Sequence, residues 1–483
     1  MPCASLKQGG YDAGERRATD CPTSAPTYDI GLSGAADTIT RVDNTLAYMD
    51  QGSFLGLQAL GRAPLMQFTW IYDHPVDIDG LRKFHCNLGH GLLGRLIECS
   101  PLPFGRHRWV SEPGPAELEI AAQDRARSDV WTWADERICL PIDPETGPAW
   151  RLGVQPLTNG GAAVALVVSH SVADALGLSL SIADAAKGIR RNLHYPLPGS
   201  RTRRQAVIED GKQTVRALPG VAKAVMAAAR VARAESDGLA TSMKPSAGEL
   251  TPGKERSVVA PTVAAYFDLD HWDERSRSLG GTSNSLFAGL AARLGQILGR
   301  VDDDGRVKLS WPVNERTEGD TRANALTAAI VTADPSKVTD SLVDLRADMK
   351  RTLTALSESP NDLLAPLPLV PFTPKALARL LEKMITKVGS PIGCSNLGEL
   401  DPAVNRPDGT DADYIAFRLL EPQITTHILD RMGGYLYLAS GRVHGQIFVT
   451  VGAWTAGGMN TKESLRRSVR QALAELQLTG IVE

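Results

Sequence analysis

The stretch from Ala162 to Gly188, AAVALVVSHSVADALGLSLSIADAAKG, decides how the rest of the chain is interpreted. Its first seven residues, Ala162 to Val168, are apolar without interruption. This run is too short to span a membrane and predicts a strand that is buried on both faces. Polar residues follow at once, and from Asp174 onward the apolar residues recur as in a packed helix. His170 therefore lies where a central strand ends and a helix begins, which holds a side chain rigidly and leaves it accessible.

His170 has the chemistry of a general base, because a neutral imidazole accepts a proton near neutral pH. Asp174 follows four residues later and could orient the histidine or hold the loop through an ion pair. The alternative is a purely structural histidine, satisfied by a backbone carbonyl, with Asp174 as the N-cap of the following helix. Five residues alone do not separate these interpretations.

The composition describes an ordinary globular chain. It has 483 residues, enough for two or three domains, with 43% hydrophobic and 22% charged residues. A net charge of −3 gives no reason to expect a nucleic-acid partner. The chain contains no run of about 18 apolar residues, and its first residues lack the apolar core of a secretory signal. The six cysteines show no C-x-x-C spacing, so we expect a reducing, cytoplasmic location without a disulfide framework.

Changes in composition divide the chain into four parts. Residues 1–35 are rich in Gly, Ser, Thr and Pro and are expected to form a flexible leader. Residues 36–195 form a first α/β unit that contains His170. Residues 196–260 form a crossover linker, with a polar stretch toward its end that predicts a mobile loop. Residues 261–483 form a second α/β unit.

The linker contains an Ala-rich stretch, Ala206 to Ala234, with interspersed Lys and Arg residues. It could be a crossover helix that packs on the body, or a basic amphipathic helix that lies on a membrane surface. Its small apolar residues favour packing, since they would bury little area in a bilayer. If the substrate is a lipid, the basic segment Arg201 to Arg233 or the Pro-rich Leu363 to Pro374 is expected to lie beside a tunnel mouth and to touch the membrane reversibly.

Local patterns predict several further elements. Alternating apolar residues from Met66 to Tyr72 predict a strand, and Asp77 or Asp79 is expected to cap the next helix. Asn159-Gly160-Gly161 predicts a tight hairpin that leads into the central strand. A capping region at Thr282 predicts the start of a helix in the second unit.

From about Thr38 to Leu478 the chain resembles the coenzyme A-dependent acyltransferases with the chloramphenicol acetyltransferase-like fold. This superfamily includes wax ester synthase/diacylglycerol acyltransferases, mycobacterial polyketide-associated acyltransferases and peptide-synthetase condensation domains. Each motif is weak alone, but five of them occur in the same order. They are the HxxxD-like His170 to Asp174, the PLW-like Pro148 to Trp150, the helix start Gly281 to Asn284, the P-V-x-x-R segment Pro312 to Arg316 with Asn324 downstream, and Ser395-Asn396.

Two positions depart from the pattern of the superfamily. Many members carry a double histidine, and the first of these positions is Ser169 here. Many have glycine after the aspartate, and this position is Ala175 here. The second histidine, which catalyses the reaction in the superfamily, is present as His170. Ser169 therefore removes a supporting group and keeps the proposed base, whereas Ala175 leaves the shape of the loop open.

The resemblance implies two α/β halves, each a mixed sheet flanked by helices, with a substrate tunnel between them. It assigns His170 the role of general base, and it pairs Asp174 with Arg316 in a structural ion pair directed away from the substrates. No acyl-enzyme is required, in agreement with the absence of a GxSxG elbow. Candidates for the tunnel wall or for oxyanion stabilisation are Ser169, Asn324, Ser395 and Asn396.

Three functions follow from this interpretation. The first is an O-acyltransferase that moves an acyl group from acyl-CoA to a hydroxyl acceptor, with a lipid-related substrate suggested by the wax ester synthase-like motifs. The second is a stand-alone condensation-type enzyme that takes its acyl group from a carrier protein and forms an ester or an amide. The third is a non-catalytic member that keeps the fold. No bound cofactor and no metal are expected, and acyl-CoA or an acyl-carrier thioester is the co-substrate.

Overall fold

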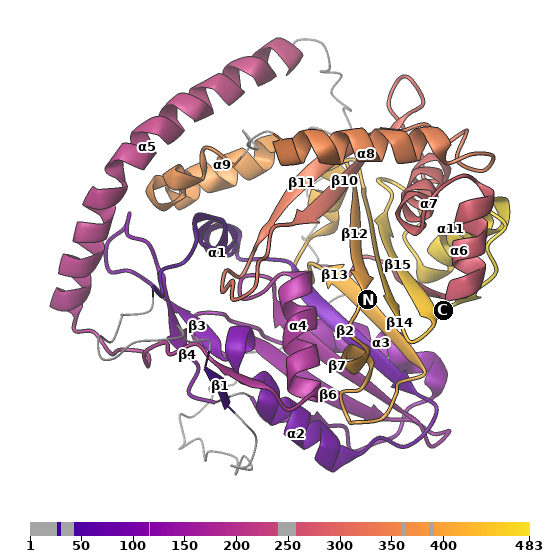
Figure 1. The fold of residues 1–483 in the computed structure, drawn as a ribbon, viewed down its shortest axis with the longest axis horizontal. Helices are drawn as coiled ribbons and strands as arrows, with labels where there is room; N and C mark the ends of the chain where they lie inside the picture. Colours follow the sequence, from indigo (N-terminus) through magenta and orange to yellow (C-terminus); the bar gives the residue numbers. More distant parts are fainter. Residues whose placement is uncertain (1–26, 30–42, 115, 240–256, 359–363, 386–390) are drawn as a thin grey trace.

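A computed structural model of the chain describes residues 27–29, 43–114, 116–239, 257–358, 364–385 and 391–483. Apart from residues 27–29, the leader expected at 1–35 lies outside the described residues. The mobile loop expected near the end of the linker falls mostly on residues 240–256, which also lie outside them. The described residues form two large mixed sheets with helices packed against them (Figure 1).

The first sheet has five strands and places β7 at its centre. β7 is antiparallel to both of its neighbours and is buried along its whole length, as the apolar run at Ala162 to Val168 predicts. β6 reaches β7 through the predicted hairpin, in which Gly160 has a φ of 86°. In order across the sheet the strands are β13 (Tyr414–Leu420), β2 (Leu65–Tyr72), β7 (Ala162–Ser169), β6 (Trp150–Pro156) and β5 (Glu119–Ile120).

Helices cover both faces of this sheet, which explains why its central strands are apolar on both sides. Val164 and Leu166 share a core with residues of α2 (Ile78–Leu88) and α4 (Ala175–Ala186). Ala163 and Ala165 pack with residues of α3 (Val130–Ile138) on the opposite face. The predicted Met66 to Tyr72 strand is present as β2 and is likewise buried on both faces.

The second sheet has seven strands. Residues of α6, α7, α8 and α11 pack against it in one common core. Its strands, in order, are β11 (Leu326–Ala333), β10 (Val307–Asn314), β12 (Ile392–Glu399), β14 (Tyr435–Val443), β15 (Gln446–Trp454), β9 (Thr262–Asp268) and β16 (Ile481–Val482). Its helices are α6 (Leu269–Ser278), α7 (Ser283–Ile297), α8 (Val343–Glu358) and α11 (Lys462–Glu475).

One strand joins the two halves of the molecule. β13 belongs to the C-terminal part of the sequence, yet it pairs with β2 at the edge of the first sheet. It also contacts the second sheet, where the Thr450 hydroxyl donates a hydrogen bond to the Phe417 carbonyl over 2.6 Å. The remaining short elements are β1 (Thr27–Asp29) with β8 (Arg190–Asn192), β3 (Arg95–Glu98) with β4 (Arg108–Ser111), α10 (Thr426–Arg431), η1 (Gly91–Leu93), η2 (Arg127–Asp129) and η4 (Pro402–Asn405).

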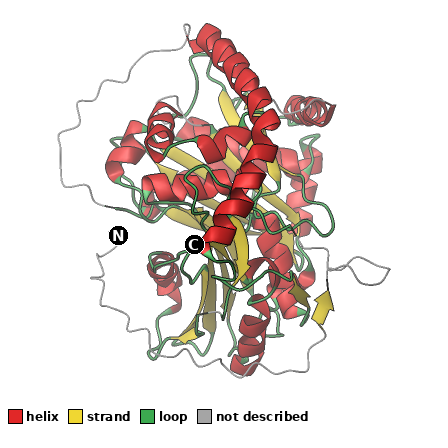
Figure 2. Ribbon diagram, turned by 90° about the vertical axis from the view of Figure 1, so that its left-hand side faces the viewer, coloured by secondary structure: helices red, strands yellow, loops and turns green. Residues whose placement is uncertain are grey.

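The Ala-rich linker forms one long helix on the outside of the molecule. This helix, α5 (Arg203–Leu239), runs along the left edge of Figure 1 and crosses the front of Figure 2. It packs on η3 (Leu367–Phe372). Both η3 and α9 (Lys375–Ile385) pack in turn on α1 (Tyr48–Leu60). None of the helices in the described ranges is long and apolar enough to cross a membrane.

Two local predictions about helix starts are confirmed. Asp77 caps α2 by accepting a hydrogen bond from the backbone N–H of Asp79. Thr282 caps α7 in a reciprocal capping box with Ser285.

The expectation of a chain without disulfide bonds is wrong at two of the described cysteines. Cys86 and Cys139 are disulfide-bonded, whereas Cys99 and Cys394 are free. Spacing along the sequence did not reveal this, because disulfide pairing depends on which residues the fold brings together. The cytoplasmic expectation, which rested partly on the cysteines, loses that support.

Candidate active site

His170 lies on a tight turn between the central strand and the helix that follows it. β7 ends at Ser169 and α4 begins at Ala175, as the sequence pattern predicts. Every other residue from Ser169 to Asp174 is buried, and His170 alone is partly exposed. Its backbone N–H donates a hydrogen bond to the Pro64 carbonyl over 3.2 Å. The turn therefore fixes the backbone of His170 and leaves its side chain accessible.

The imidazole of His170 is not engaged by its surroundings. Within the described residues no hydrogen bond, ion pair or ring contact involves its side chain. The interpretation of a structural histidine satisfied by a backbone carbonyl is therefore not supported by this geometry. Both ring nitrogens remain available to a substrate.

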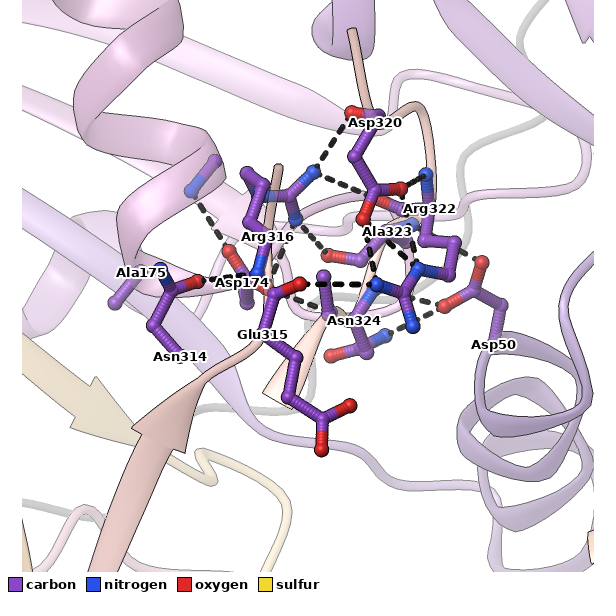
Figure 3. Close-up of polar contacts among 12 residues, drawn as sticks. Asp50, Asp174, Ala175, Asn314, Glu315, Arg316, Asp320, Arg322, Ala323 and Asn324 are labelled. Atoms are coloured by element: carbon purple, nitrogen blue, oxygen red, sulfur yellow. Dashed lines mark hydrogen bonds and ion pairs between the residues drawn. The ribbon is translucent and has the colours of Figure 1, made fainter. Parts of the chain in front are cut away.

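Asp174 caps the following helix and also forms the predicted ion pair. One carboxylate oxygen accepts from the Gly177 N–H at 2.7 Å, as an N-cap does. The other accepts from Arg316 Nη2 at 2.9 Å and from the Ala325 N–H at 2.8 Å (Figure 3). The side chains of Asp174 and Arg316 are 5% and 4% exposed. Both carboxylate oxygens of Asp174 thus hold the loop, and among the described residues neither forms a hydrogen bond or an ion pair with the His170 ring.

Arg316 organises the connection between β10 and β11. Its guanidinium donates to the backbone carbonyls of Asp320, Arg322 and Ala323 at 2.9–3.1 Å (Figure 3). The backbone N–H of Asp174 in turn donates to the Ala323 carbonyl over 2.7 Å. A loop of the second half is therefore bonded directly to the turn that carries His170.

Asp50, on α1, is a buried member of this network that the sequence analysis missed. It is 0% exposed and accepts hydrogen bonds from the backbone N–H groups of Ala323 and Asn324 at 3.0 and 2.8 Å (Figure 3). The Asn324 amide also donates to Asp50, and to the His170 carbonyl over 3.3 Å. Burial raises the pKa of Asp50, and the hydrogen bonds from Ala323 and Asn324 oppose that rise.

Arg95 is the second residue that sequence reasoning missed. Its guanidinium donates to the carbonyls of Val172 and Thr321 at 2.9 and 2.5 Å and lies 3.8 Å from the centre of the Trp109 ring. Its burial lowers its pKa. Arg95 thus bonds one residue of the His170 turn and one residue of the β10–β11 loop. No sequence motif indicates that Arg95 or Asp50 belongs to the site, because most of their hydrogen-bond partners are backbone atoms remote in sequence.

The other predicted site residues fall into two groups. Asn324 contacts the His170 turn as described, and Ser169 is buried within the turn, where its hydroxyl accepts from the Ser171 N–H at 3.3 Å. Ser395 and Asn396 lie on β12, and no described hydrogen bond joins them to the turn. Asn396 instead donates to Asn284 at the start of α7 over 2.6 Å.

A pocket of ≈ 410 Å³ opens beside Asn284, between the start of α7 and helix α8. Arg346 and Lys350, one turn apart on α8, line it together with hydroxyl and apolar side chains. Both cations are exposed, and neither forms an ion pair with a described residue. The pocket is therefore positively charged. No group of three or more His, Cys, Asp or Glu side chains in the described ranges is arranged to hold a metal ion.

Ala175 is accommodated without strain. It is the first residue of α4 and has no positive φ. The crowded position is Gly177, where an added Cβ would lie 3.0 Å from Arg316 Nη2 and 3.1 Å from an Asp174 carboxylate oxygen. The position where a Cβ would be crowded is thus in the first turn of α4, two residues beyond the position that the superfamily pattern indicates.

No family model matches the chain, and no curated protein matches it by sequence. Among solved structures, the first condensation domain of the CDA synthetase is similar with a TM-score of 0.56 and 13% identity, over 91% of this chain and 99% of that one. The wax ester synthase/diacylglycerol acyltransferase from Marinobacter aquaeolei VT8 is similar with a TM-score of 0.54 and 12% identity, over 90% and 98%.

The trichothecene 15-O-acetyltransferase TRI3 from Fusarium sporotrichioides is also similar, with a TM-score of 0.55 and 12% identity, over 90% of this chain and 94% of that one. These likenesses span almost the whole length of each protein. They show that the chain has the two-lobed chloramphenicol acetyltransferase-like fold, as the resemblance of its motifs predicted.

Proposed function

We propose that the protein transfers an acyl group from a thioester donor, acyl-CoA, to a hydroxyl acceptor, with His170 as general base. The observation that carries this proposal is the free, partly exposed His170 imidazole on a turn clamped by both halves of the molecule. A rigid turn with an accessible base holds the acceptor and the donor in a fixed relation, which replaces part of the entropy cost of a bimolecular encounter.

The reaction needs one proton relay. His170 removes the proton of the acceptor hydroxyl as its oxygen attacks the thioester carbonyl, and a tetrahedral oxyanion forms. Collapse of this intermediate breaks the carbon–sulfur bond, and the departing thiolate takes the proton back from the imidazolium. Asp174 and Arg316 position the turn and take no part in the proton transfer.

A covalent cysteine intermediate is not needed, and the free cysteines do not favour one. Burial, with the neighbouring Glu145, raises the pKa of the Cys99 thiol to about 12, and burial alone raises the pKa of Cys394. A thiol with a raised pKa is a poor nucleophile at neutral pH, because the thiolate is the reactive form. Direct attack by the acceptor is therefore the simpler route.

The pocket between α7 and α8 supports a phosphate-bearing donor. Arg346 and Lys350 supply positive charge without a described anionic partner. Phosphate groups of coenzyme A, or of a carrier protein's pantetheine arm, have the charge that these side chains complement. A lipid-related substrate rests on the wax ester synthase-like motifs and on the likeness to the wax ester synthase/diacylglycerol acyltransferase.

The test measures thiol release from acyl-CoA thioesters of several chain lengths, with alcohols as acceptors. We expect His170→Ala to lower turnover by about 10²–10⁴-fold and to leave the unfolding temperature unchanged. His427→Ala is the matched control, because it removes an exposed imidazole on α10. Near-normal turnover in purified His170→Ala protein would exclude His170 as the base.

A second candidate is a condensation-type reaction that takes its acyl group from a carrier protein. The likeness to the first condensation domain of the CDA synthetase is the observation that supports this candidate. Transfer from a loaded carrier protein, without thiol release from any CoA thioester, would support this candidate. Absence of transfer from both donors, with retained thioester binding, would indicate the non-catalytic alternative.

A further inference from the structure

Helix α5 exposes an unusual amount of apolar surface. Six large apolar side chains along it are 40–64% exposed. A helix that only connects the two halves of the molecule would be expected to bury such side chains against the body of the protein. The six residues are Val207, Ile208, Val215, Leu218, Val225 and Met226, which we call the α5 stripe.

The α5 stripe occupies one side of the helix, and the body of the protein occupies the other. With 3.6 residues per turn, its six members fall within an arc of roughly 100°. Ala206, Asp210 and Ala224, on the inner side, are buried at 2–6% exposure. Asp210 fixes this inner side by accepting hydrogen bonds from Ser100 and Arg201, each over 2.6 Å. The helix therefore packs through one face and presents a separate apolar face outward.

The same helix is basic in a chain that is acidic overall. α5 contains seven Lys or Arg residues against four Asp or Glu residues, a net charge of +3, whereas the whole chain has −3. Arg204, Lys212 and Arg216 are exposed, and none of them forms an ion pair with a described residue. Apolar side chains flanked by unpaired cations are typical of helices that lie at a membrane interface.

We propose that the α5 stripe docks reversibly on a lipid surface that carries negative charge. An anionic bilayer complements both features, since its interior accepts the apolar side chains and its headgroups attract the cations. A second copy of the chain complements only one of them, because its own α5 would bring the same positive charge to the contact. This assigns the Ala-rich segment both of the roles considered for it from the sequence, one on each face of the helix.

The described part of the Pro-rich segment is mostly half-buried against the rest of the protein. It contains η3, which packs between α5 and α1, and Pro371 is buried. α1 carries Asp50 and Ser53, and the Ser53 hydroxyl lies 3.3 Å from that of Ser171 in the His170 turn. The docking face is thus connected to the candidate site through η3 and α1. An apolar substrate held in the bilayer would then lie on the α5 side of η3, which packs on α1.

The test is co-sedimentation of the full-length protein with unilamellar vesicles, without any substrate. The vesicles contain phosphatidylcholine alone, or phosphatidylcholine and phosphatidylserine in equal amounts. We expect binding to the mixed vesicles at low salt, weaker binding to phosphatidylcholine alone, and loss of binding at high salt. Because no turnover is measured, the result is independent of the proposed reaction.

Two variants that add the same charge distinguish the contribution of the α5 stripe to vesicle binding from the effect of charge alone. Leu218→Asp removes a stripe residue and adds one negative charge, and we expect it to lower the partition coefficient by more than about tenfold. Gly220→Asp adds the same charge two residues away on an exposed position where an added Cβ meets no atom within 4 Å. It should lower binding by no more than about fivefold. Unchanged unfolding temperatures show that both variants fold.

A third variant, Arg204→Gln with Lys212→Gln, leaves the stripe intact and should weaken binding to the mixed vesicles roughly tenfold or more. Equal binding by the Leu218→Asp and Gly220→Asp proteins would overturn the proposal. So would absence of binding to the mixed vesicles at low salt. A dimer in solution that Leu218→Asp dissociates, without vesicle binding by the wild type, would also overturn it and assign the stripe to a second copy.

Discussion

Replacing Asp174 by Asn tests the clamp that holds the His170 turn. The native carboxylate accepts three hydrogen bonds, from the Gly177 N–H, the Ala325 N–H and Arg316 Nη2. An amide offers one oxygen and one NH₂ group. In either orientation of the amide, its NH₂ group faces a donor in place of the lost acceptor. The substitution preserves the size of the side chain while removing both the charge and part of the acceptor capacity.

The expected loss is about 3–5 kcal/mol of unfolding free energy, because removing one partner of a buried ion pair leaves the other charge uncompensated. Both side chains are at most 5% exposed, so solvent screening does not reduce this value much. Arg316 keeps its hydrogen bonds to three backbone carbonyls, which places the expected loss toward the lower end of the range. Turnover should fall with stability, since the turn carries the proposed base.

Urea unfolding followed by circular dichroism measures the change, with thiol release measured on the same preparations. Asp79→Asn is the matched control, because Asp79 pairs with Arg82 at 78% and 64% side-chain exposure. That change should cost no more than about 1 kcal/mol. If Asp174→Asn were as stable and as active as the wild type, the ion pair would not be what holds the turn.

Three further predictions concern two members of this network and the pH dependence of stability. Asp50→Ala leaves the buried backbone N–H groups of Ala323 and Asn324 without an acceptor. The free energy of unfolding, measured by urea titration, should therefore fall by at least about 1–3 kcal/mol. A smaller change would mean that water replaces the carboxylate. Gly177→Ala should lower both stability and turnover, because its Cβ would press on the ion pair, and an unaffected variant would contradict this account. Stability should also fall as the pH drops below about 6.5, since burial lowers the pKa of three histidines in the folded state and unfolding then takes up protons. Flat urea midpoints between neutral and mildly acidic pH would contradict this last expectation. These histidines are His85, His90 and His107.

Much of the candidate site could be predicted because its signal is local. The unbroken apolar run before His170 and the helical period after Asp174 place the histidine at the junction of β7 and α4 without knowledge of the tertiary structure. The ion pair between Asp174 and Arg316 has no local signal, because the two residues are remote in sequence. It came from the resemblance to known acyltransferases, and no periodicity in this chain would have paired them.

The rest could not be predicted for a physical reason. Asp50 and Arg95 stabilise the turn mainly through backbone groups, and a backbone N–H or carbonyl looks the same at every position of a sequence. The partners of Asp50 lie more than 270 positions away, where only the folded arrangement of the two halves identifies them. The same reason explains why Cys spacing failed to indicate that Cys86 and Cys139 are disulfide-bonded.

The His170 turn is shaped as much by the second half of the molecule as by the first. Its backbone and Asp174 bond to Ala323, Asn324, Ala325 and Arg316, all from the β10–β11 region. A shift of that region by the length of one hydrogen bond would release several of these contacts together, since all pass through the same short loop. The arrangement of the two halves therefore controls the position of the proposed base, and substitutions that loosen their contact should impair catalysis even when they lie far from His170.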